Sequence, residues 1–160
     1  MIHHVSIPAR DPKHVASVLA ELLGGYAGPF VGPFPGAYVA YAEDDFGTGF
    51  EVYPEDLVLA PGDTMAQGVK GEPPKGLAFH ALVSVKASRA DIERIAAREG
   101  WRCQHDWRGP KGMKLFELYE LWVENRVLLE LATEDMLAGY VKIARGAAQK
   151  ELFAQLARSR

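Results

Sequence analysis

A short apolar segment that carries a histidine occurs twice in this chain, and no other feature limits the possible folds as strongly. The two copies are His3–Pro12 and Phe79–Ser88, and each leads into residues that typically open a helix. Each histidine is followed, 47 or 50 residues later, by a glutamate between apolar residues, Glu51 in the first half and Glu130 in the second. The offset of 76 to 79 residues exceeds the short solenoid periods, so the sequence predicts two copies of one supersecondary unit.

Length and composition are those of an ordinary globular protein. The 160 residues are 48% hydrophobic and 24% charged, which suits one domain or two small fused modules. A net charge of −3 offers no basic surface for nucleic acid or anionic lipid, so neither is an expected partner. The start of the chain does not resemble a secretory leader, and no apolar run is long enough for a spanning helix. The single cysteine, Cys103, cannot form an intrachain disulfide, and together these features predict a cytoplasmic protein.

The first copy begins with a strand and continues into a helix. From residue 2 to residue 9 apolar and polar side chains alternate, and His4 lies on the face opposite the apolar residues. Asp11 followed by Pro12 is typical of a helix start, because Asp accepts hydrogen bonds from the free N–H groups and Pro needs no donor there. Apolar residues continue at helical spacing up to Gly24, so a helix is expected from about 12 to 23.

The rest of the first half predicts a loop and two further strands. Tyr26–Ala37 is rich in Gly and Pro and is expected to form a loop with at most a short edge strand. Strands are expected over 38–42 and 49–53, and alternation directs Glu51 away from the core. The segment after them is again rich in Gly and Pro, and it is expected to link the two modules.

The second copy repeats this order more clearly. His80 lies on a predicted strand over 77–85, opposite its apolar face. Ser88 with Asp91 three residues later resembles a capping box, and Gly100 ends the helix that they open. Further strands are expected over 101–107, 114–123 and 127–132. Each half is therefore predicted to follow the order βαβββ.

The predicted fold class is α+β with four segments. These are a first βαβββ module over 1–54, a linker over 55–76, a second module over 77–133 and a C-terminal helix over 134–160. A linker of about 20 residues is long enough for the modules to pair within one chain or to exchange between two chains. Both arrangements remain open.

The C-terminal helix is predicted to be amphipathic. Its first turn is acidic and its last turn basic, as the helix dipole favours. Its apolar stripe is available to the body of the protein or to a partner, which makes a homodimer one expected arrangement. The stripe consists of Met136, Tyr140, Ile143, Ala147, Leu152 and Leu156.

Four residues form a candidate metal site: His4, Glu51, His80 and Glu130. Two imidazoles and two carboxylates suit a divalent ion such as Ni, Zn, Fe(II), Mn or Co, and four ligands leave two octahedral positions for substrate oxygens. Taken singly, a strand histidine is more often a hydrogen-bonded structural residue, and a strand glutamate is more often solvated. The matched occurrence of both residue types in both halves favours the metal site.

These residues and their surroundings resemble the vicinal oxygen chelate superfamily, the group of glyoxalase I, bleomycin-resistance proteins, methylmalonyl-CoA epimerase, fosfomycin-resistance proteins and extradiol dioxygenases. His4 with Asp11 is similar to the opening strand and helix cap of that family. Asp45–Val52 resembles its turn and fourth strand, where an acidic residue and a glycine precede the metal-binding glutamate. The second copy departs from the family at Glu124–Arg126, where Asp-Pro-Asp-Gly-Asn is common.

The resemblance implies that the two modules form a curved open barrel around a metal ion. His4 and His80 match the first-strand ligands, and Glu51 and Glu130 match the fourth-strand ligands, a set similar to that of bacterial glyoxalase I. The implied activity is that of a divalent-metal-dependent lyase or isomerase acting on a small oxygenated substrate through a metal-chelated enediolate or enolate. Glu51 or Glu130 would then also be the catalytic base.

Two other functions remain open at this point. The first is a non-catalytic ligand-binding protein of the same fold, for resistance or sequestration, whose pocket the four polar residues merely line. The second is a metal-dependent dioxygenase or transferase. The dioxygenases take two histidines and a glutamate from one module, and the predicted strand over 114–123 contains no histidine. No motif marks a glutathione, coenzyme A or antibiotic site.

Overall fold

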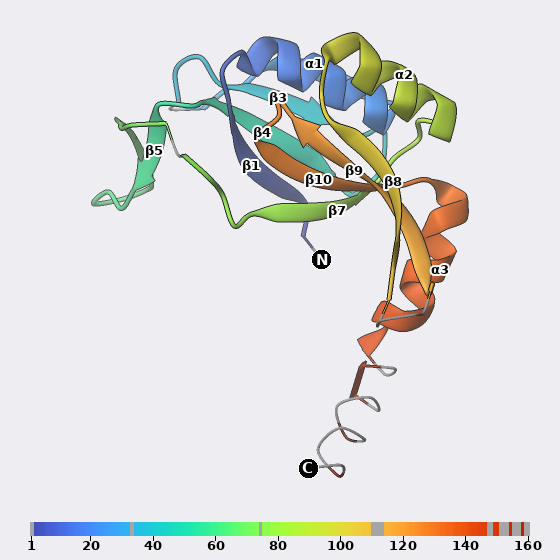
Figure 1. Cartoon of the computed structure of the whole chain (residues 1–160). Coiled ribbons are helices and arrows are strands. Elements are labelled where there is room, and N and C mark those ends of the chain that lie inside the picture. Colours follow the sequence, from blue (N-terminus) through green and yellow to red (C-terminus); the bar gives the residue numbers. More distant parts are fainter. Residues whose placement is uncertain are drawn as a thin grey trace.

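The helices and strands of the two halves follow the same order. The computed structural model describes residues 2–32, 34–73, 75–109, 114–146, 149–150, 154 and 158. The first half contains β1 (His4–Ala9), α1 (Pro12–Leu23), β2 (Tyr26–Pro29), β3 (Tyr38–Tyr41) and β4 (Gly49–Pro54). The second half contains β7 (His80–Ser84), α2 (Arg89–Glu99), β8 (Cys103–Arg108), β9 (Phe116–Val123) and β10 (Val127–Ala132). Both halves are βαβββ units, which confirms the predicted α+β class (Figure 1).

Each unit forms its own open four-stranded sheet, and the two sheets have equivalent strand orders. The order is β1-β4-β3-β2 in the first sheet and β7-β10-β9-β8 in the second, so β1 and β7 are edge strands. In each sheet the first strand of the unit pairs in parallel with the last. His4 lies opposite Gly49, two residues before Glu51, and the same diagonal joins His80 to Glu130. The duplication therefore extends to the register of single residues.

Capping residues fix the starts of α1 and α2 as the sequence predicts. The Asp11 side chain accepts a hydrogen bond from the backbone N–H of His14 at 3.0 Å. Gly24 ends α1 with a φ of 68°, a left-handed conformation that favours glycine. At α2, Ser88 and Asp91 form both hydrogen bonds of a capping box.

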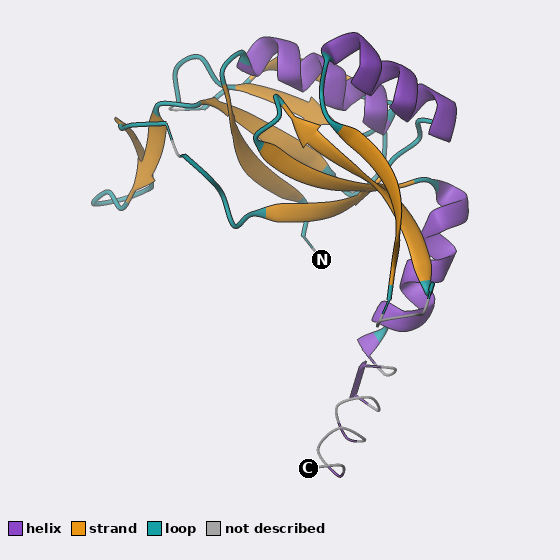
Figure 2. Ribbon diagram, in the orientation of Figure 1, coloured by secondary structure: helices purple, strands orange, loops and turns teal. Residues whose placement is uncertain are grey.

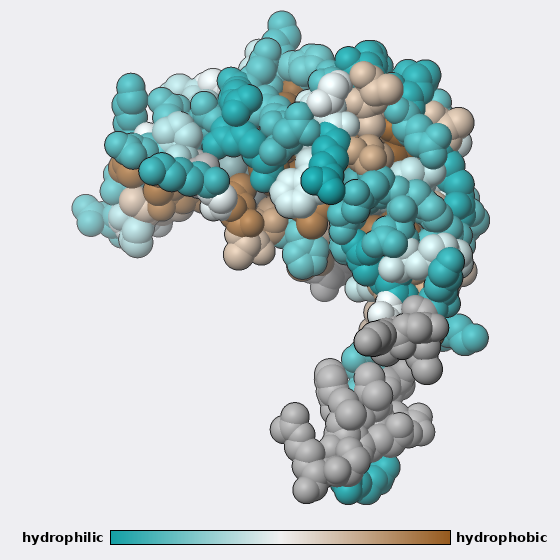
Figure 3. All heavy atoms as spheres, viewed as in Figure 1, coloured by the Kyte–Doolittle hydropathy of each residue, from teal (hydrophilic) through white to brown (hydrophobic). Residues whose placement is uncertain are grey.

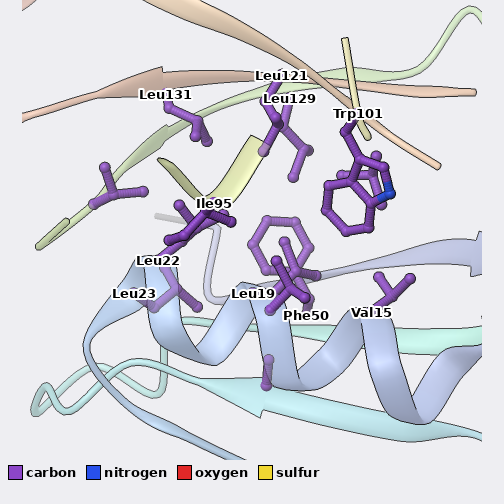
Figure 4. Packing of buried hydrophobic residues seen from close by; sticks show 14 of the residues in the cluster. Val15, Leu19, Leu22, Leu23, Phe50, Ile95, Trp101, Leu121, Leu129 and Leu131 are labelled. Atoms are coloured by element: carbon purple, nitrogen blue, oxygen red, sulfur yellow. The ribbon is translucent and has the colours of Figure 1, made fainter. Parts of the chain in front are cut away.

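One hydrophobic core joins the two units. Ile7 and Val52, on β1 and β4, are 1% and 0% exposed, and Leu129 and Leu131 of β10 belong to the same cluster. Figure 4 shows Leu22 of α1 and these two leucines projecting into the same space. Because side chains alternate along a strand, the four predicted site residues lie on the sheet faces turned away from this core.

The two units also meet through polar contacts around the helices. Helices α1 and α2 lie side by side over the sheets (Figure 2), and Arg98 of α2 donates to Glu21 of α1 at 2.8 Å. The carboxylate of Glu124, in the turn after β9, accepts from the backbone N–H groups of Arg10 and Asp11 at 2.8 and 3.2 Å. The start of α1 is thus bound to the second unit.

The segment expected as a linker contains a β-hairpin. Strands β5 (Leu57–Ala60) and β6 (Gln67–Lys70) pair with each other as a separate two-stranded sheet. Figure 1 shows β5 at one end of the molecule, and Figure 3 shows apolar atoms on the surface there. The exposed apolar residues of this hairpin are Val58, Leu59, Met65 and Val69.

The C-terminal helix differs from the prediction of one uninterrupted helix over 134–160. Helix α3 (Glu134–Ala144) ends where Arg145 takes a non-helical ψ of 134°. Met136, the first residue of the predicted stripe, is 2% exposed and belongs to the common core, so it packs against the protein itself. The later stripe residues Ala147, Leu152 and Leu156 lie outside the described residues. In the described part of the chain, no helix combines the length and apolarity needed to cross a membrane.

Candidate metal and ligand site

The strands that carry the two predicted histidines border one cavity. A cavity of about 970 Å³ is lined by His4 at the start of β1 and by His80 on β7, together with the β3–β4 turn and the first turn of α3. Apolar side chains form much of the remaining wall. They include Val5, Leu23, Phe50, Phe79, Val85 and Leu137. A mostly apolar wall with a few polar groups is typical of small-molecule sites, which makes this cavity the candidate ligand site.

In the first sheet, His4 and Glu51 lie next to each other on the face away from the core. His4 Nε2 is 3.7 Å from Glu51 Oε1. The other carboxylate oxygen, Oε2, accepts hydrogen bonds from the hydroxyl of Ser6 at 3.3 Å and from that of Tyr53. The Glu51 side chain is 14% exposed, while that of His4 is 55% exposed. Two neutral donors therefore hold one oxygen of Glu51, and the other oxygen faces the imidazole.

Tyr53 supports Glu51 from a largely buried position. Its ring packs against that of Phe34, with the centroids 5.0 Å apart, and a smaller cavity of about 320 Å³ lies between Tyr53, Ser6 and the hairpin. Burial, followed by the hydrogen bond to Glu51, raises the pKa of Tyr53 to about 12. The phenol therefore remains a hydrogen-bond donor at neutral and moderately alkaline pH.

In the second sheet, Glu130 is paired with an arginine. Arg108 Nη2 lies 3.5 Å from Glu130 Oε1. The same guanidinium pairs with Glu120, which lies directly opposite Glu130 on β9, and with Asp106 at 2.7 Å. Gln104 Nε2 donates to Glu120 Oε2 at 3.1 Å. Glu130 is thus engaged by a cation, whereas the partners of Glu51 are hydroxyls and an imidazole.

The donor chemistry of these faces suits a divalent ion in part. Ligand atoms that bind one ion at about 2.1 Å lie roughly 3 Å apart when adjacent, and the 3.7 Å between His4 and Glu51 is close to that separation. Glu130 would first have to release Arg108. Across the residues that the structure describes, no group of three or more His, Cys, Asp or Glu side chains is arranged to hold a metal ion. The set of His4, Glu51, His80 and Glu130 therefore stays a prediction.

The remaining histidines each have a partner of their own. His3 Nδ1 lies 2.5 Å from a backbone carbonyl of the β3–β4 turn, and His3 also lines the larger cavity. His14 Nε2 is 2.5 Å from Glu99 Oε2, and His105 Nε2 is 2.6 Å from Glu117 Oε2. These histidines fix the turn, the contact between the helices and the outer part of the second sheet.

Sequence reasoning missed Ser6, Arg108 and Glu120 as parts of these clusters. Ser6 shares a strand face with His4, so alternation alone could have found it. The polar alternation that ends in Arg108 indicates a polar strand face, but it does not reveal which carboxylate the long side chain reaches. That depends on the pairing of β9 with both of its neighbours.

Comparison with known proteins finds solved structures that match most of the chain at low sequence identity. No protein-family model and no curated protein sequence matches the chain. A glyoxalase/bleomycin resistance protein/dioxygenase from Alicyclobacillus acidocaldarius is 19% identical, with 83% of this chain and 90% of that chain covered and a TM-score of 0.43. A lactoylglutathione lyase from Agrobacterium tumefaciens is 12% identical, with 84% of this chain and 93% of that chain covered and a TM-score of 0.47. Oxidase ChaP-H1 is 18% identical, with 84% of this chain and 95% of that chain covered and a TM-score of 0.45.

The paired βαβββ architecture itself rests on the strand order and register of this chain. Activity has to be inferred from the chain's own residues, because one fold supports many functions.

Proposed function

We propose that this chain is a divalent-metal-dependent lyase or isomerase that acts on a small oxygenated substrate, with His4, Glu51, His80 and Glu130 as the metal ligands. The observation that carries the proposal is the equivalent placement of the His–Glu pair in the two units. Each histidine lies on an edge strand, and each glutamate is its diagonal neighbour on the adjacent parallel strand. Structural roles alone give no reason for the same two residue types to recur at the same register.

The surroundings of these residues support such a role. Hydrogen bonds from Ser6 and Tyr53 hold the Glu51 carboxylate, and partners of this kind commonly orient metal ligands. A bound divalent ion supplies Lewis-acid stabilisation of negative charge on adjacent substrate oxygens. The apolar wall of the cavity beside His4 and His80 would enclose the rest of the substrate and exclude water.

One of the two glutamates would move the proton. A general base must lie within hydrogen-bond reach of the carbon-bound proton that it removes. Glu51 is the better placed, because its Oε1 faces the His4 imidazole, whereas Oε1 of Glu130 faces the Arg108 guanidinium. Glu51 would take the proton from the carbon beside the substrate oxygens and return it to the product. Ser6 and Tyr53 would keep the carboxylate in place during both transfers.

Metal titration tests the ligand assignment. Untagged full-length protein is titrated with Co²⁺ alone by calorimetry at fixed pH. We expect His80→Ala to weaken binding by at least about tenfold. The matched control is His14→Ala, which removes an imidazole paired with Glu99 and should leave binding unchanged. Equal binding by the parent and by folded His80→Ala would contradict the assignment.

Proton exchange tests the reaction class. Small compounds with two adjacent oxygens are incubated with the metal-loaded protein in D₂O, and deuterium incorporation at the neighbouring carbon is followed by NMR. We expect exchange with the parent protein and loss of exchange in Glu51→Gln, which keeps an oxygen ligand but no basic carboxylate. Undiminished exchange in metal-loaded Glu51→Gln would assign the proton to another group.

A ligand-binding protein without catalysis is the second candidate. The observation that favours it is the cavity itself, whose described lining contains both histidines but neither Glu51 nor Glu130. Such a protein would bind its ligand equally well with and without a chelator. Thermal-shift screening of small apolar compounds in the presence and absence of EDTA separates the two functions, because the enzyme requires the metal and the binder does not.

A further inference from the structure

The first strand of the second unit, β7, has a free backbone edge. β7 pairs with β10 on one side, and no other strand in the described part of the chain pairs with it. The N–H of Val85, directly after β7, donates to the carbonyl of Ala132 on β10 at 3.0 Å. Because successive residues of a strand direct their backbone groups to opposite sides, those of His80, Leu82 and Ser84 point to the free edge. This edge lies on the outside of the molecule (Figure 1), and every residue of β7 lines the larger cavity.

The other three outer edges of the two four-stranded sheets carry residues that block pairing. β1 contains Pro8, β2 ends in Pro29, and β8 carries Asp106 and Arg108. Proline and charged residues on an edge strand prevent further strands from adding to a sheet. β7 has the sequence His-Ala-Leu-Val-Ser, which contains no Pro, Gly, Asp, Glu, Lys or Arg. Of the four edges that the structure describes in these sheets, β7 is therefore the one open to another strand.

Exposed apolar side chains surround this edge. Ile2 and Phe46 line the same cavity as β7 and are 80% and 59% exposed. Leu77, three residues before β7, is 39% exposed, and Leu82 and Val83 on the strand itself are only partly buried. Apolar residues exposed together in this way mark an interaction surface. A strand that adds to β7 would gain backbone hydrogen bonds and would also cover apolar area.

We infer that two copies of this chain associate through antiparallel pairing of their β7 strands. A two-fold axis at Leu82 places this residue opposite its counterpart in the other copy, and it places His80 opposite Ser84. All three residues direct their backbone groups to the free edge, so the pairing forms about six backbone hydrogen bonds. A charged residue near the axis would approach a copy of itself, and Phe79–Val85 contains no Asp, Glu, Lys or Arg. The edge is thus complementary to itself.

This pairing leaves the candidate metal and ligand site in place. The hydrogen bonds use backbone groups, so the imidazole of His80 stays available. The second copy adds a strand beside the cavity that β7 lines, and it covers part of the exposed apolar rim. The association requires no metal ion, and it holds whether or not His80 is a metal ligand.

Light scattering of the full-length, metal-free protein at about 1–500 µM tests the association. We expect a dimer of the parent. Leu82→Pro removes the N–H at the axis, and Leu82→Lys places two like charges opposite each other, so both should associate at least about tenfold more weakly. The matched control is Leu59→Lys, which puts the same charge on the β5–β6 hairpin, where Leu59 is 48% exposed. Its association should stay within about twofold of the parent.

Hydrogen exchange distinguishes strand pairing from other contacts. In concentrated parent protein the N–H groups of Leu82 and Ser84 should exchange at least about tenfold more slowly than in dilute protein. A parent that stays monomeric overturns the inference, and so does a dimer in which these two N–H groups exchange at the rate of the monomer. Loss of the dimer in Leu59→Lys, but not in folded Leu82 variants, assigns the contact to the hairpin and also overturns it. If the Leu82 variants are not folded by circular dichroism, the exchange measurement on the parent decides.

Discussion

Replacing Tyr53 by Phe removes a buried hydroxyl whose ionisation is coupled to folding. Tyr53 is 6% exposed, and its hydroxyl donates to Glu51. Burial first, and the hydrogen bond to Glu51 second, raise its pKa to about 12. In the unfolded chain a tyrosine has a pKa of about 10. Because the pKa of Tyr53 is higher in the folded state, the tyrosine ionises first in the unfolded chain as the pH rises. The stability that Tyr53 contributes is therefore fully present below pH 10 and is lost as the pH rises towards 12.

The expected effect has a part at neutral pH and a part at alkaline pH. At pH 7, loss of the hydrogen bond to the Glu51 carboxylate should lower the free energy of unfolding by about 1.5–3 kcal/mol. The difference of about two pKa units corresponds to about 2.7 kcal/mol over the whole alkaline window, of which about 1.4 kcal/mol is lost by pH 11. Only the parent protein loses this alkaline contribution, so the stability gap between parent and variant should narrow by about that amount between pH 9 and pH 11.

Urea unfolding followed by tryptophan fluorescence measures the gap at each pH. The matched control is Leu129→Ala, which empties part of the common core and removes no titratable group, so its deficit should stay constant over the same pH range. A gap between the parent and Tyr53→Phe that is equally wide at pH 9 and pH 11 would refute the coupling between Tyr53, its burial and Glu51.

Two further predictions concern contacts away from the candidate site. Glu124→Ala should lower the free energy of unfolding by about 1–3 kcal/mol, because the carboxylate accepts hydrogen bonds from the backbone N–H groups of Arg10 and Asp11. Urea unfolding measures this free energy. An unchanged unfolding midpoint would exclude a role for Glu124 in joining the two units. Burial, followed by the charge of Glu93, raises the pKa of Cys103 to about 11. Because the thiolate is the reactive form, this single thiol should react with Ellman's reagent at pH 8 about a hundredfold more slowly than an unperturbed cysteine. Release of one equivalent of chromophore within seconds would show that Cys103 is not held in this environment.

The parts of the fold that local rules control could be predicted from the sequence. Helix ends depend on contacts between residues a few positions apart. The structure has the N-cap Asp11 and the C-cap Gly24 of α1, and the capping box of Ser88 and Asp91 at α2, where the sequence indicates them. Alternation along β1 and β4 placed the apolar residues in the core and left Glu51 on the other face, because side-chain period two is a property of any strand.

The features that depend on contacts distant in the sequence could not be predicted. The pairing of Arg108 with Glu130 requires three strands in register and a long flexible side chain that has several acids within reach. The hairpin of β5 and β6 lies in a segment whose Gly and Pro content favours loops, and its strands are only four residues each. The interruption at Arg145 falls within a continuous amphipathic pattern, so no local signal marks it.

A crystal of the full-length protein grown with Co²⁺ would test the central claim most directly, through an anomalous difference map collected at the cobalt edge. The proposed function predicts one strong peak within about 2.0–2.3 Å of a nitrogen of His4, a nitrogen of His80 and oxygens of Glu51 and Glu130, whether these residues come from one chain or from two. A map without a peak at these residues, or with a peak bound elsewhere on the surface, would contradict the proposed metal-dependent function.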